Sequence, residues 1–123
     1  MQTLVTEYTR FMYRKPTKSY RSAFLKYLQS GTELYSFIKN YTNLSWFTPS
    51  KYTFSEFSSS EYSWTDDSRT AVRCRVHLHV EMYGYSSQTK TNITTSEDFD
   101  AFITISFTQD GKGLIYSVSN IEQ

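Results

Sequence analysis

The sequence has one cysteine, little net charge and no long apolar run, and each shortage excludes a class of protein. The single cysteine, Cys74, rules out an internal disulfide framework and any all-cysteine metal site. A formal net charge of +1 provides no whole-protein field that would attract nucleic-acid backbones or anionic lipid. No stretch approaches the roughly 20 apolar residues of a membrane span, and the N-terminus has no signal-peptide hydrophobic region. We therefore expect no nucleic-acid binding and no membrane insertion by this segment.

Aromatic residues are abundant instead. They make up 18% of the 123 residues, with eleven tyrosines and nine phenylalanines. A chain of this length fits one domain, which removes roughly two thirds of its extended-chain surface from water. We therefore predict a single domain over residues 1–123, with a core filled largely by rings rather than by aliphatic side chains.

Helical periodicity dominates the N-terminal third. Apolar residues recur there at three- and four-residue spacing, which predicts helices over residues 2–14, 18–30 and 33–41. Thr17 and Thr32 stand where N-caps of the second and third helices are needed, because their hydroxyls can accept from the first free backbone N–H groups.

From residue 51 onward the apolar period changes from 3.6 to 2, which predicts strands. The serine run 58–60 indicates a bulge or a sheet edge, and Asp110-Gly111 is typical of a tight hairpin. The polar residues 85–97 lack apolar periodicity and predict a long, exposed and mobile connection. Trp46 and Phe47, with Leu44, predict an aromatic plug at one end of the core.

The longest alternating stretch runs from Thr70 to Gly84 and predicts the central strand. Successive strand residues point to opposite faces, so one face is apolar and the other polar. The apolar face carries Val72, Cys74, Val76, Leu78, Val80 and Met82. The polar face carries Arg73, Arg75, His77, His79, Glu81 and Tyr83. We expect Cys74 to be a small buried hydrophobe and the polar face to meet water, a ligand or a partner.

The polar face of this strand is the candidate binding surface. Arginine can donate two parallel hydrogen bonds to a carboxylate, and tyrosine offers both a ring and a hydroxyl, so the row suits an anionic or peptide ligand. The competing interpretation is an ordinary exposed face with cross-strand charge pairs. His77 and His79, with Glu81 as a third ligand, have a spacing that can hold a transition metal. Arg73 and Arg75 on the same face would repel a dication, so we predict no metal site and no cofactor.

Three helices over about residues 2–41 followed by strands over about residues 51–121 predict an α+β domain. Its helices pack on a curved antiparallel meander of four or slightly more strands. The order of these elements resembles the nuclear transport factor two-like superfamily, the cone-shaped fold that ketosteroid isomerase and scytalone dehydratase share. It is also similar to extracytoplasmic domains of Gram-positive surface and conjugation proteins. The resemblance rests on the pattern of nearly the whole chain and on no diagnostic motif.

The resemblance implies where catalysis would lie. Isomerases and dehydratases of this fold use an Asp or His inside the cone, and Asp98 and Asp100 are the nearest candidates for a carboxylate base. Such residues more often serve as turn residues at the start of a strand. Because the predicted core faces are filled by rings, we assign no catalytic residue.

The hypothesis favoured by the sequence is a non-catalytic interaction or ligand-binding accessory domain of an extracytoplasmic bacterial protein. It would belong to a longer exported or membrane-tethered chain and could form a homodimer through its sheet. One alternative is a small-molecule-binding isomerase- or dehydratase-like enzyme with a pocket between sheet and helices. Another is an assembly subunit of a conjugation or secretion channel.

Overall fold

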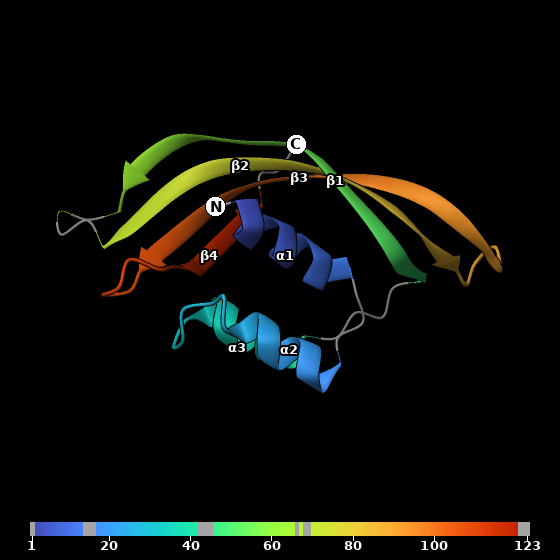
Figure 1. The fold of residues 1–123 in the computed structure, drawn as a ribbon, viewed down its shortest axis with the longest axis horizontal. Helices are drawn as coiled ribbons and strands as arrows, with labels where there is room; N and C mark the ends of the chain where they lie inside the picture. Colours follow the sequence, from blue (N-terminus) through green and yellow to red (C-terminus); the bar gives the residue numbers. More distant parts are fainter. Residues whose placement is uncertain (1, 14–16, 42–45, 66, 68–69, 121–123) are drawn as a thin grey trace.

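The computed structural model describes residues 2–13, 17–41, 46–65, 67 and 70–120. Three helices precede four strands, as predicted, and the fold class is α+β (Figure 1). The elements in chain order are α1 (Gln2–Tyr13), α2 (Lys18–Leu25), α3 (Glu33–Asn40), β1 (Phe47–Trp64), β2 (Ala71–Ser86), β3 (Thr91–Phe107) and β4 (Gly113–Asn120).

Capping threonines begin the second and third helices as predicted. Thr17 Oγ1 accepts from the Tyr20 backbone N–H and Thr32 Oγ1 from that of Tyr35, each at 3.2 Å. The predicted length of the second helix is wrong, because α2 ends at Leu25. Beyond α2 the chain turns, and the segment around Leu28 forms a parallel bridge to Ile115 of β4, so backbone groups of this segment pair with the sheet edge instead of continuing a helix.

The four strands form one antiparallel sheet in the order β1-β2-β3-β4. The sheet is arched, and all three helices lie under its concave side, with α1 nearest to it (Figure 1). β1 is an edge strand that begins at Phe47, earlier than the predicted residue 51, and Pro49 is compatible with this edge position. As predicted, the serine run of β1 lies beside register shifts, between Ser55 and Ser58 and between Ser60 and Ser63.

The predicted connection over residues 85–97 is wrong. β2 continues to Ser86, a short turn follows, and β3 begins at Thr91, so this region is the end of a long β2–β3 hairpin. Its threonines are β-branched and favour the pleated backbone, although they supply no apolar pattern. Lys90 closes the turn at a φ of 58°, a left-handed conformation that Gly or Asn usually adopts. The sequence therefore carried no signal for this turn.

The core lies between the concave face of the sheet and the helices. On β2 the apolar residues from Cys74 to Met82 are at most 1% exposed, which confirms the predicted facing. Phe11 of α1 stacks on Phe24 of α2, with ring centroids 4.6 Å apart. Among the described core residues that are buried, only Tyr8, Phe11, Phe24 and Phe47 are aromatic, so the predicted core of rings is wrong: most of its buried side chains are aliphatic. Cys74 is a buried free cysteine whose thiol pKa is raised by burial.

Two smaller features concern the aromatic plug, where the prediction is wrong in part, and the register of β4. The aromatic plug is divided, because Phe47 is buried against Val80 and Met82 while Trp46 is exposed; Leu44 lies outside the described residues. In β4, a register shift beside Ile115 places both Ile115 and Val118 opposite buried β3 residues, so strict alternation does not hold along this strand.

Candidate functional site on the outer face of the sheet

The structure places all six predicted polar-face residues on the outer, convex side of β2. We call them the outer row: Arg73, Arg75, His77, His79, Glu81 and Tyr83. The helices lie on the opposite side of the sheet, so the outer row faces away from the core (Figure 1). The neighbouring positions of β1 and β3 present mainly serines, threonines and carboxylates to the same face.

Asp98 and Asp100 lie on β3 directly opposite the outer row, in the register pairs His79–Asp98 and His77–Asp100. Their predicted position at the start of a strand is wrong, because β3 begins seven residues before Asp98, at Thr91. Asp100 accepts two hydrogen bonds from the Arg75 guanidinium, at 3.3 Å from Nε and 3.1 Å from Nη2. These bonds hold the pKa of the Asp100 carboxyl below its usual range.

Asp98 contacts both histidines of the outer row. Its Oδ1 lies 2.9 Å from His79 Nδ1, within hydrogen-bonding distance, and 3.7 Å from His77 Nε2. The hydrogen bond to Asp98 raises the pKa of His79, with further support from the charges of Asp98, Glu56 and Glu81. The environment of His79 is therefore negative, despite the two arginines earlier on the same strand.

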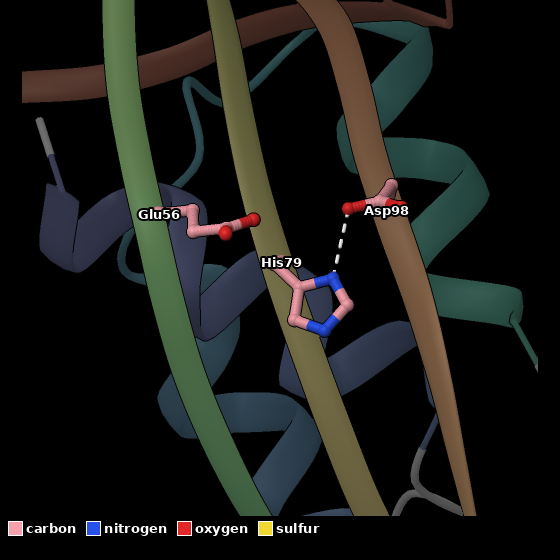
Figure 2. Close-up of side chains that lie close together, drawn as sticks. All are labelled: Glu56, His79 and Asp98. Atoms are coloured by element: carbon pink, nitrogen blue, oxygen red, sulfur yellow. Dashed lines mark hydrogen bonds and ion pairs between the residues drawn. The ribbon is translucent and has the colours of Figure 1, made fainter.

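Two glutamates of β1 extend this cluster, and each sits at a register shift of the strand. Glu56 has a φ of 57° and Glu61 a φ of 56°, so the chain at both positions adopts the left-handed conformation of a bulge. Glu61 lies 4.0 Å from Arg75 Nη1. Glu56 lies beside His79 and Asp98 (Figure 2).

These two glutamates are functional candidates that the sequence prediction missed. Simple alternation along β1 places Glu56 with Phe54 and Tyr52, on one face of a regular strand. The bulges break that alternation and turn both carboxylates toward the polar face. The serine run between them was the available signal, since it predicted irregular pairing at this point.

The arginines of the outer row are each partnered locally. Arg75 is shared between Asp100 and Glu61, and the Arg73 guanidinium carbon stands 3.8 Å from the centroid of the Phe102 ring. This cation–π contact covers Phe102 on the outer face. The charge of Arg75 is therefore offset by two carboxylates, whereas Arg73 keeps its positive charge while its guanidinium lies over a ring.

The Tyr83 end of the outer row has a different character. Tyr83 is 45% exposed and Tyr85 48% exposed, so two large rings stand on the open surface. A hollow of about 470 Å³ adjoins Tyr83 and is lined by Lys51, Thr53, Glu81, Met82, Tyr83 and Thr94. Exposed tyrosines beside a concavity with one base and one acid are typical of a contact surface.

In the part of the chain that the structure describes, buried side chains occupy the centre of the space between helices and sheet, where an enzyme of this fold would hold its substrate. Phe11, Phe24, Leu78, Ile103 and Ile115 occupy it and are at most 2% exposed. Asp98 and Asp100 project from the other side of the sheet. The two candidate bases are thus outside the cone, on the open face.

An arched antiparallel sheet over three N-terminal helices defines this chain as a helix-backed α+β domain. No protein-family model matches it, and a search of curated proteins finds no match. Among solved structures it is similar to an "Ntf2 like protein involved in plasmid conjugation", with a TM-score of 0.54 and 13% identity. The alignment covers 98% of this chain and 47% of that protein, so this chain spans about half of its length. The fold is nuclear transport factor two-like, as the sequence pattern predicted.

None of the described helices is long and apolar enough to cross a membrane.

Proposed function

We propose that this domain is a non-catalytic interaction module that binds a partner protein through the outer face of its sheet. The observation that carries the proposal is the filled interior. Side chains that are at most 2% exposed take up the volume between helices and sheet, while the polar side chains gather on the opposite, open face. A general acid or base of the catalytic type works inside an enclosed pocket, whereas Asp98 and Asp100 lie on the open outer face of the sheet.

We place the centre of the binding surface at Tyr83 and Tyr85. Tyrosine is enriched among the residues that dominate protein interfaces, because one ring buries a large area at little conformational cost. The adjoining hollow between Lys51 and Glu81 can take a side chain of the partner. Arg75 and His79 of the outer row already have carboxylate partners within the sheet. A partner that covers them would therefore leave fewer buried polar groups without a hydrogen bond than if they were unpaired.

The setting we propose is an accessory or assembly role in an extracytoplasmic apparatus. The similar solved structure is described as involved in plasmid conjugation, and it is about twice as long as this chain. A second copy of this domain is one partner that this surface could accept, which would give the homodimer expected for the fold.

Site-specific photocrosslinking in the native host tests this proposal. A benzophenone amino acid replaces Tyr83, and a matched variant carries it at Phe37 of α3, which is similarly exposed but lies on the helical side. We expect a discrete crosslinked product from the Tyr83 position and none from Phe37. The mass of the product distinguishes a second copy from a different protein. Absence of a product at Tyr83, or the same product from both positions, would contradict the proposed surface.

A further inference from the structure

We propose that Glu56, His79 and Asp98 form a binding site for a divalent transition metal ion, with zinc as the best-suited ion. Each residue comes from a different strand, and their side chains converge over β2 on the outer face (Figure 2). One ligand atom from each residue lies within 4.8 Å of the other two. This site does not depend on the proposed partner surface, which is centred on Tyr83.

The spacing of the donors is close to what a zinc ion requires. Zinc lies about 2.0 to 2.2 Å from imidazole nitrogen and carboxylate oxygen, so tetrahedral ligands stand about 3.3 to 3.6 Å apart. His79 Nδ1 and Asp98 Oδ1 are already 2.9 Å apart. Glu56 is exposed, and rotation of its side chain brings a carboxylate oxygen the remaining distance.

The bulge in β1 is what supplies the third donor. At a φ of 57° the backbone of Glu56 departs from the regular strand, and its carboxylate is directed toward β2 (Figure 2). Ser55 is the register partner of His79, and serine is a poor zinc ligand; without the bulge, Glu56 would point to the opposite face. The irregularity thus creates a donor set of one imidazole and two carboxylates.

The charge around the site favours a cation. The sequence pattern suggested that Arg73 and Arg75 would repel a dication. In the structure Asp100 and Glu61 contact Arg75, and Arg73 lies over the ring of Phe102. Glu81 follows on the same face, so three carboxylates surround His79. A dication here would offset mutual repulsion among them.

The donor set also predicts selectivity. Imidazole suits zinc, copper, nickel and cobalt, whereas magnesium and calcium prefer sites made wholly of oxygen ligands. We therefore expect zinc to bind and magnesium to bind weakly or not at all. A bound ion would tie β1 to β2 and β3 at the first bulge and stabilise the edge strand.

Isothermal titration calorimetry with zinc chloride tests the site. The protein carries no polyhistidine tag and is first treated with a chelator. We expect one zinc ion per chain and no comparable binding of magnesium chloride. E56Q, H79A and D98N should each weaken zinc binding by at least about tenfold, because the loss of a residue that merely supports a ligand already costs about that much. Circular dichroism verifies that each variant remains folded.

E61Q is the matched control, because Glu61 has the same backbone conformation in the second bulge of β1 but contacts Arg75. Because Glu61 acts on the site only through Arg75, we expect E61Q to lose much less zinc affinity than E56Q does. The proposal is overturned if the wild type does not bind zinc, if magnesium binds equally well, or if E61Q loses as much affinity as E56Q. Photocrosslinking at Tyr83 is unaffected by any of these results, so the two proposals fail separately.

Discussion

Neighbouring residues of β2 meet opposite environments. Val76 is fully buried against the helices, while His77 stands on the outer face beside Asp98. We predict that V76D abolishes cooperative unfolding, because it places a carboxylate in the apolar core, and that H77A shifts the urea midpoint only slightly. Urea denaturation followed by circular dichroism measures both. Comparable, severe losses from the two substitutions would contradict the assigned facing.

Tyr8 provides a pH-dependent probe of the core. Burial, together with the nearby Tyr41, raises the pKa of Tyr8 from 10.0 to about 12. The unfolded chain therefore ionises this phenol at a lower pH than the folded protein does. The contribution of the neutral Tyr8 phenol to the free energy of unfolding is fully present below pH 10. It is lost as the pH rises to about 12, and the loss amounts to about 3 kcal/mol.

Urea denaturation at pH 7, 10 and 11.5 measures this alkaline loss. We expect it to be smaller in Y8F than in the wild type, whereas Y116F, which removes an exposed phenol, retains it. Equal alkaline losses in Y8F and the wild type would show that the Tyr8 phenol does not remain neutral in the folded protein.

At the scale of elements, strands with one apolar face were predictable from the sequence and irregular strands were not. The central strand alternates clearly from Val72 to Tyr83, so its facing followed from the pattern, whereas its end at Ser86 did not. The first half of β3 has few apolar residues, and its pairing with β2 depends on backbone hydrogen bonds and β-branched threonines. The candidate site shows the same division: the outer row was predicted, whereas Glu56 and Glu61 depend on bulges that no periodicity reveals.

The pairing of β1 with β2 includes a close approach at Gly84. A Cβ at this position would lie 2.2 Å from the Thr48 carbonyl oxygen and 2.6 Å from Pro49 Cα, both backbone atoms. We predict that G84A destabilises the protein by about 2 to 3 kcal/mol, because the start of β1 must move away. Chemical denaturation measures the loss.

Gly111 in the β3–β4 turn is the comparison for that substitution. It has a φ of 83°, and a Cβ there would meet nothing within 4 Å. Asparagine tolerates this conformation, so G111N should cost less than about 1 kcal/mol. If G84A were as mild as G111N, the close approach between β1 and β2 would not be a constraint on folding.

At the scale of the whole molecule, one core joins the three helices to the sheet. The cluster of buried side chains draws on α1, α2, α3, β2, β3 and β4, and the sheet alone would expose its concave face to water. Three short helices have too little propensity to persist without that face. Helices and sheet should therefore depend on each other, as expected for a single domain over residues 1–123.

This dependence predicts one cooperative unfolding transition. Ellipticity at 222 nm follows mainly the helices, and tryptophan fluorescence follows the two ends of β1, because Trp46 precedes that strand and Trp64 ends it. We expect the two thermal transitions to coincide and the calorimetric enthalpy to equal the van't Hoff enthalpy, at about 85 kcal/mol near 60 °C for a chain of this length. If the helical signal were lost first, the helices would form a separate unit, and the filled interior that supports the proposed interaction role would not be a permanent feature of the fold.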